Sequence, residues 1–169
     1  MITGPLSSRA QELSAQGCAF VTASAEELEV DLEPFERLAQ APMGMTAHVV
    51  YTAWDPDRPA SLSAIVIRDI IRGRIGFDGF LMSDDIGMEA LAGDFGSRAA
   101  GVIAAGCDAA LHCSGKLEEM VAGAAAAPLL SPDGEARLAR AMAATMLDVA
   151  DGPDMAEALA KRDQLLALV

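Results

Sequence analysis

Two adjacent carboxylates, Asp84 and Asp85, follow Ser83 at the end of an apolar stretch that begins near Phe77. A positioned carboxylate can act as a nucleophile or, when it carries a proton, as a general acid. It can also cap a helix by accepting hydrogen bonds from the first N–H groups of that helix. We expect Asp85 to cap a helix. For Asp84 capping is a weaker explanation, because one cap leaves the second of two costly like charges unexplained, and the pattern alone leaves Asp84 between capping and chemistry.

The two histidines of the chain, His48 and His112, each fall near the C-terminal end of a predicted strand. A lone histidine in an apolar run is more often a hydrogen-bonded core residue than a catalyst. In parallel α/β folds, however, ligands collect where the strands end, because loops and helix N-termini converge there. This position favours His48 as a pocket-lining residue beside Asp84, and His112 occupies the matching place in the next unit.

A metal site near His112 is not favoured by the spacing of its neighbours. Cys107 and Cys113 flank it, but the ligand spacings of familiar zinc sites are absent. Both cysteines lie in an apolar run and are expected to be small core residues. We therefore predict no metal and no cofactor.

The elements that must position these side chains form three repeated units, each an apolar run followed by a helical pattern. Residues 43–51 precede the loop "TAWDPDRPAS" and a helix with Ser63 at its start and Gly73 at its end. Residues 77–85 precede a helix over 86–105, which Gly106 ends, and residues 107–115 precede "KLEEMVAGAAAA". Strands that are apolar without alternation are buried on both faces. The pattern is typical of an α/β fold with a parallel sheet.

The two ends of the chain add helices to these units. Residues 131–150 predict a helix with Ser131 as its cap and Pro132 in its first turn, and a last helix covers about 155–168. Residues 1–20 form an atypical N-terminal segment, with a helix in "SSRAQELSAQG" and a short strand in "CAFVTAS". Residues 24–40 predict a turn and an acidic helix with Pro34 near its first turn. We treat 1–169 as a single domain.

Composition limits the partners and the setting. The 169 residues carry a formal charge of −13, which repels phosphate backbones and anionic membrane surfaces, so neither nucleic acid nor a membrane is expected. The odd number of cysteines, 3, and the lack of an apolar signal segment favour a reduced, cytoplasmic setting.

The segments "MGMTAHVVYTAWDPDRPASLS", "VIRDIIRGRIGFDGFLMSDDIGMEAL" and "AAGCDAALHCSG" resemble consecutive parts of the bacterial β-N-acetylhexosaminidases of glycoside hydrolase family 3. The resemblance covers roughly residues 21 to 120. It implies parallel βα units that form the C-terminal part of a TIM (β/α)8 barrel, incomplete in this chain, with the three units as its sixth to eighth.

The same resemblance implies an activity and site residues. The expected reaction is the retaining removal of terminal β-linked N-acetylglucosamine from peptidoglycan fragments during cell-wall recycling. Asp84 matches the nucleophile of the "SDD" motif, at a helix N-terminal edge that would keep its pKa low, and His48 and Ser83 are the expected substrate-binding residues.

One part of the family pattern is missing. The family carries its acid/base histidine, paired with an aspartate, in a segment close to "KHFPGHG" and then "DSH", and this chain has "SAQGCAF" before "VTAS" instead. Hydrolysis by the chain alone is therefore expected to be feeble, and its open sheet predicts self-association or a complementing chain. The alternative is a non-catalytic remnant that binds sugar or another protein. An α/β phosphate-binding domain ranks last, because no Gly-rich phosphate loop occurs.

Overall fold

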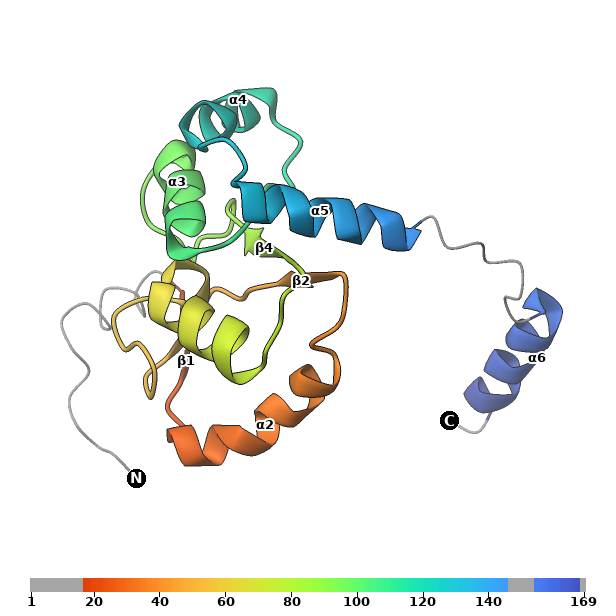
Figure 1. The fold of residues 1–169 in the computed structure, drawn as a ribbon. Coiled ribbons are helices and arrows are strands. Elements are labelled where there is room, and N and C mark those ends of the chain that lie inside the picture. The colour runs from red at the N-terminus through yellow and green to blue at the C-terminus, as the bar shows by residue number, and fades with distance from the viewer. Residues whose placement is uncertain (1–16, 146–153, 168–169) are drawn as a thin grey trace.

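The computed structural model describes residues 17–145 and 154–167. Figure 1 shows helices on both sides of short parallel strands, with α6 apart from the rest. The main sheet has the order β2-β4-β5 and is parallel throughout; its strands are β2 (Met43–Met45), β4 (Phe80–Asp85) and β5 (Ala109–Leu111). The predicted α/β class with parallel βα units is confirmed.

The predicted strand over 43–51 is wrong as a single strand. It divides into β2 and β3 (Val49–Tyr51), and β3 pairs in parallel with β1 (Ala19–Val21) in a separate two-stranded sheet. After β2, the Thr46 N–H still donates to the Met82 carbonyl of β4 at 2.9 Å, but the Ala47 carbonyl accepts from Ser61 N–H at 3.1 Å, outside either sheet. The strand expected in "CAFVTAS" is confirmed as β1.

Helix α2 (Ala25–Arg37) precedes β2 and is set by its first residues. Ser24 Oγ accepts from Glu27 N–H and the Glu27 carboxylate accepts from Ser24 N–H, which is a reciprocal capping box. Because this cap starts the helix at Ala25, Pro34 falls near the end of α2, and its predicted place in the first turn is wrong.

The helical segment between β2 and β4 has irregular turns. A 3₁₀ turn, η1 (Ala60–Leu62), leads to a π-helix, η2 (Val66–Arg74), and Ser63 Oγ accepts from Val66 N–H as the predicted cap. The wide turns are seen at the exit, where Ile75 N–H donates to the Ile70 carbonyl at 2.8 Å. Because of these wide turns, the helical segment continues beyond Gly73, where the sequence predicted its end. The left-handed residue that ends it is Gly76, with φ 74°.

Helix α3 (Phe95–Ala105) begins nine residues after the predicted start at Ile86. Asp94 is its cap, because Asp94 Oδ1 accepts from Ser97 N–H at 2.7 Å, and Gly93 before it has φ 90°. The Arg98 side chain reaches back and donates to the Ile86 carbonyl at 2.8 Å, which holds the preceding turns. Gly106, with φ 115°, ends α3 as predicted.

The last helices follow the sequence prediction closely. Helix α4 (Leu117–Ala126) follows β5, and α5 (Pro132–Thr145) is capped by Ser131, whose Oγ accepts from Gly134 N–H at 3.1 Å. Helix α6 (Met155–Leu166) is exposed along its length. The predicted helix over residues 7–17 falls almost wholly outside the described residues, as does the predicted continuation of α5 to residue 150.

The base of the sheet is tied by one buried carboxylate. Asp108, whose side chain is 5% exposed, accepts from Leu81 N–H at 2.9 Å and pairs with Arg72 at 3.0 Å and with Arg137 at 3.1 Å. Arg72 comes from η2 and Arg137 from α5. Because β4, η2 and α5 share this partner, the carboxylate fixes their relative positions.

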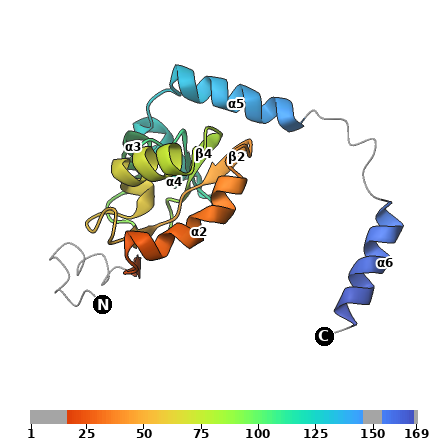
Figure 2. The same ribbon diagram turned by 60° about the horizontal axis from the view of Figure 1, so that its bottom comes forward.

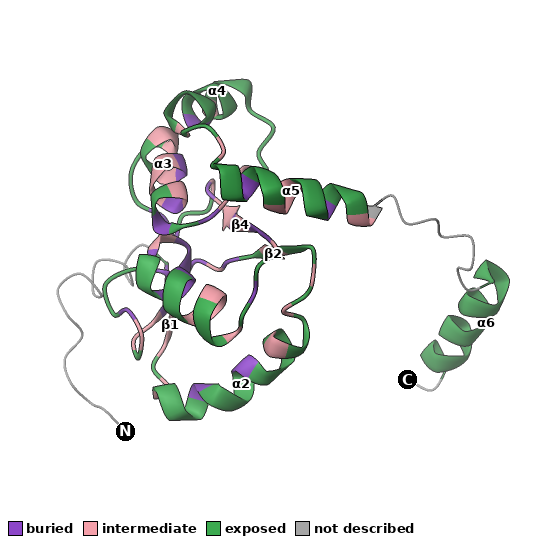
Figure 3. Cartoon of the chain, viewed as in Figure 1, coloured by how far each residue is buried: buried purple, intermediate pink, exposed green. Residues whose placement is uncertain are grey.

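The core lies between η2, β4 and α3 (Figure 3). Its buried members include Ile67, Leu81, Leu91 and Val102, and α3 packs along α4 (Figure 2). Within the described part of the chain, β2 and β5 each pair on one side only, so the sheet has two open edges. Among residues 17–145 and 154–167, no helix has the length and apolar character needed to cross a membrane.

Candidate active site

Ser83, Asp84 and Asp85 are the last three residues of β4, at its C-terminal end. Ser83 is 0% exposed, and its hydroxyl donates to the Asp84 carbonyl at 2.7 Å and accepts from Leu111 N–H at 3.1 Å. Ser83 therefore joins β4 to β5 from a buried position.

Asp84 is half-buried on the opposite side of β4 from the buried Ser83. Its Oδ1 accepts from the Asp85 N–H at 2.8 Å, and no hydrogen bond found among the described residues uses Oδ2. One carboxylate oxygen is thus held and the other is available. The expected support from a helix N-terminus is wrong, because α3 begins only at Phe95.

Asp85 does not cap a helix, and that prediction is also wrong. Its Oδ1 accepts from Gly87 N–H at 2.8 Å and from Cys113 N–H at 3.2 Å, so it closes a tight turn and ties the end of β5 to β4. Desolvation opposes ionisation of the carboxyl, but these backbone bonds and the nearby His112 outweigh it and lower the pKa of Asp85.

His48 is buried, with 4% exposure, and both ring nitrogens have partners. Nδ1 lies 2.6 Å from Ser61 Oγ, and Nε2 lies 2.9 Å from the main-chain carbonyl oxygen of Asp85. Since a carbonyl can only accept, we assign the proton to Nε2, which leaves Nδ1 to accept from the Ser61 hydroxyl. In this arrangement His48 supports the strand end that carries Asp84.

The loop before η1 and η1 itself supply supporting side chains that the sequence did not single out. Ser61 is fully buried against His48, and Asp55 is buried, accepting from the Ser63 hydroxyl at 2.6 Å and from Asp57 N–H at 3.1 Å. The sequence signal that could have pointed to these residues was the turn-like composition of "DPDRPAS", but any turn could have this composition.

His112 belongs to a second cluster at the end of β5. Its Nε2 lies 2.8 Å from Ser114 Oγ and 3.1 Å from Glu119 Oε2, and Nδ1 lies 3.5 Å from Asp85 Oδ1. Its ring meets the Phe95 ring edge-on at 5.0 Å between centroids. This histidine is therefore held between two carboxylates.

The cysteines divide between core and surface. Cys107 is buried as expected, and burial raises its pKa to about 11. Cys113 is exposed, so its predicted place in the core is wrong, because the chain leaves the sheet after Leu111. Desolvation and the charges of Asp85 and Asp84 raise the pKa of the Cys113 thiol. No group of three or more metal-ligating side chains occurs within the described residues.

A cavity of about 480 Å³ lies elsewhere, between α2, β2 and η2. Asp84, Asp85, Ser83 and His48 are not among its lining residues, so the carboxylate pair lies outside this cavity.

Comparison with known proteins places these features in a family. Residues 9–145 match the model of the glycosyl hydrolase family 3 N terminal domain. A Beta-hexosaminidase of Chromobacterium violaceum is 47% identical over 114 residues, which are 65% of this chain and 32% of that protein. A Beta-hexosaminidase of Alkalilimnicola ehrlichii is 47% identical over 88 residues, 50% of this chain and 25% of that protein. The chain thus spans a third or less of these relatives.

Solved structures agree with the sequence comparison. NagZ from Neisseria gonorrhoeae, in complex with N-trifluoroacetyl-D-glucosamine, has a TM-score of 0.60 at 32% identity over 72% of this chain and 35% of its own. A family 3 β-N-acetylglucosaminidase from Paenibacillus sp. has a TM-score of 0.59 at 32% identity over 73% of this chain and 25% of its own. The parallel units are part of a TIM-type barrel, and the chain belongs to glycosyl hydrolase family 3.

Proposed function

We propose that Asp84 is the nucleophile of a retaining β-N-acetylhexosaminidase site that removes terminal β-linked N-acetylglucosamine. The observation that carries the proposal is the placement of this carboxylate. It stands at the C-terminal end of β4 with Oδ1 held by the Asp85 N–H at 2.8 Å, in a family 3 chain similar to β-N-acetylglucosaminidases. The C-terminal ends of barrel strands are where such folds carry their chemistry.

The proposed reaction has two steps at Asp84. The carboxylate attacks the anomeric carbon, the bond to the leaving oxygen breaks, and a glycosyl ester forms. Water then attacks the same carbon and releases the sugar and the free carboxylate. Two inversions at one carbon give net retention of configuration.

His48 and Ser83 enter the proposal as positioning residues. We predicted both to bind substrate, but both are buried and their polar atoms bind the protein. Their contribution is to fix the end of β4: Ser83 holds the Asp84 carbonyl, and His48 holds the Asp85 carbonyl. A precise carboxylate direction is what nucleophilic attack requires.

The proton for the leaving oxygen has to come from outside these residues. The chain has 2 histidines; both ring nitrogens of His48 have partners, and Nε2 of His112 bonds to Ser114, while its buried Nδ1 makes no hydrogen bond and lies 3.5 Å from Asp85 Oδ1. General acid catalysis contributes roughly 10² to 10⁴ in rate. We therefore expect this chain alone to hydrolyse glycosides feebly, and to gain activity when the rest of a family 3 barrel is supplied.

Hydrolysis of an aryl N-acetylglucosaminide tests the proposal. The chain would be assayed alone and with the part of the Chromobacterium violaceum relative that lies outside the matching 114 residues. Activity should rise on addition and be lost in Asp84→Asn. Asp163→Asn on the exposed helix α6 is the matched control and should behave as the wild type. Activity unchanged by Asp84→Asn would refute the role of Asp84.

Peptidoglycan fragments as substrate and a cytoplasmic setting complete the proposal. The three cysteines are all free, which supports a reducing compartment.

A non-catalytic sugar-binding or protein-interaction role is the second candidate, favoured by the internal bonding of both ring nitrogens of His48. Calorimetric titration with N-acetylglucosamine separates the two forms of this role, since a pure protein-interaction module gives no binding heat.

A further inference from the structure

Strand β2 presents a backbone edge that no strand of residues 17–145 or 154–167 pairs with. Phe80 N–H donates to the Pro42 carbonyl at 2.9 Å, and Thr46 N–H donates to the Met82 carbonyl at 2.9 Å. Hydrogen-bonding groups alternate in direction along a parallel strand, so those of Met43 and Met45 point away from β4. An edge of this kind is a template for one more parallel strand.

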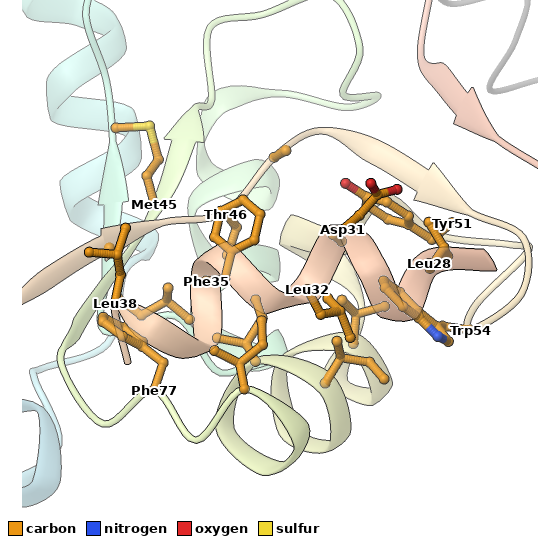
Figure 4. Close-up of a pocket in the computed structure, with 18 of the residues that line it drawn as sticks. Leu28, Asp31, Leu32, Phe35, Leu38, Met45, Thr46, Tyr51, Trp54 and Phe77 are labelled. Carbon is orange, nitrogen blue, oxygen red and sulfur yellow. The ribbon is translucent and has the colours of Figure 1, made fainter. Parts of the chain in front are cut away.

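An apolar cavity adjoins this edge. Its volume is about 480 Å³, and Figure 4 shows Leu38 and Phe77 at one end and Tyr51 and Trp54 at the other. Asp31 is the one charged residue among the described residues that line it. The lining comes from α2, β2 and η2 and includes Leu28, Leu32, Phe35, Met43, Met45, Ile70 and Ile71. A strand laid against β2 would bring apolar side chains into this space.

Exposed apolar side chains gather near both edge strands of the main sheet, β2 and β5. On α2, Phe35 is 59% and Leu38 64% exposed; Met45 on β2 is 53% exposed. At the other edge, beside β5, Leu117 and Val121 of α4 are 72% and 58% exposed. Figure 1 shows α2 and α4 on opposite sides of the sheet strands. A closed barrel would cover both edges at once, because closure joins the two sheet edges.

We propose that the edge of β2 and the adjoining cavity dock a parallel strand from a polypeptide that carries the remaining βα units of the barrel. The proposal rests on the partial barrel that underlies the proposed function. A barrel of this type has eight strands. The main sheet supplies three of them, so a second copy would still leave the barrel open. In contrast, this chain matches 32% of the Chromobacterium violaceum relative, and the uncovered length is sufficient for the other strands.

Binding is tested separately from hydrolysis. The full chain is co-expressed with the part of that relative outside the matching residues, and the complex is purified and titrated. We expect a one-to-one complex and slower amide hydrogen exchange at Met43 and Met45. Met45→Lys places a charge against the docked strand and should weaken binding at least tenfold. Met155→Lys, on α6, is the matched control and should bind as the wild type; circular dichroism checks that both variants fold.

The other outcomes are equally decisive. Absence of a complex, or equal binding by Met45→Lys, would overturn the docking site. A stable homodimer that Met45→Lys weakens and the added polypeptide does not displace would assign the edge to a second copy and also overturn it. Asp84→Asn should bind as the wild type. A complex that forms normally but hydrolyses nothing would therefore refute the proposed function and leave the docking site standing.

Discussion

His48 Nε2 lies 2.9 Å from the main-chain carbonyl oxygen of Asp85, across 37 residues of sequence. The ring is fixed on its other side by the Ser61 hydroxyl at 2.6 Å from Nδ1. A buried side chain from the segment between β2 and β3 thus sets the backbone that follows the candidate nucleophile.

This relationship predicts energetic coupling between His48 and Ser61. His48→Phe leaves the buried Ser61 hydroxyl without its partner and removes one of two hydrogen bonds to the Asp85 carbonyl, which still accepts from Met88 N–H, so it should cost about 1 to 3 kcal/mol of unfolding free energy. Ser61→Ala should cost about 1 kcal/mol. In a double-mutant cycle followed by urea unfolding, the two effects should differ from additivity by about 1 kcal/mol or more. Additive effects would mean that the two side chains do not act together.

Asp108 provides a second test of stability. Asp108→Asn removes the charge that faces Arg72 and Arg137 from a side chain that is 5% exposed, so we expect a loss of about 3 kcal/mol. Asp78→Asn is the matched control, because Asp78 also pairs with Arg137 but its side chain is 73% exposed. The control should lose about 1 kcal/mol or less. Chemical denaturation measures both; an equal loss would contradict the importance of burial.

The lowered pKa of Asp85 predicts an acid-dependent term in stability. Its usual value is 3.8, and the folded value lies below it, so the unfolded chain binds the proton more readily. The contribution is present above the unfolded pKa and is lost as the pH falls through the folded one. Asp85→Asn should therefore have a lower free energy of unfolding than the wild type at neutral pH. As the pH falls below 3.8, the free energy of unfolding should decrease less for Asp85→Asn than for the wild type, which urea unfolding across that range measures. A curve parallel to the wild type would exclude this role.

Two glycines should respond in opposite directions to alanine. Gly106 has φ 115°, and an added Cβ would meet Ile67 Cγ2 at 3.0 Å, so Gly106→Ala should destabilise by about 1 to 2 kcal/mol. Gly123 lies inside α4, and its nearest atoms would be 3.9 Å from an added Cβ. Gly123→Ala should be neutral or stabilise by up to about 1 kcal/mol. Thermal unfolding compares them, and equal shifts would refute the argument.

The fold class followed from the sequence because apolar runs and helical patterns alternate, and because Ser63, Gly106 and Ser131 are local signals that the neighbouring backbone obeys. Local signals also explain why the start of α3 was predicted too early. Residues 86–94 have a helix-like composition, but the Asp94 cap and the positive φ of Gly93 delay the helix.

The candidate site was only partly predictable. Asp84 could be singled out by its place in the motif, but two partners of Asp85 lie in distant segments: Cys113 after β5 and His48 before β3. No local pattern reports a contact across such a separation. The break in the strand after Thr46 likewise involves Ser61, which tertiary folding brings to the Ala47 carbonyl and to His48.

The buried carboxylate of Asp108 also bears on how the molecule opens. It bonds to the amide of Leu81 and to guanidinium groups from η2 and α5, so none of these segments can leave alone without stranding a charge. Their amide protons should exchange with solvent in one cooperative step. Helix α6 shares none of these bonds within the described residues, and its amides should exchange earlier, as an independent unit.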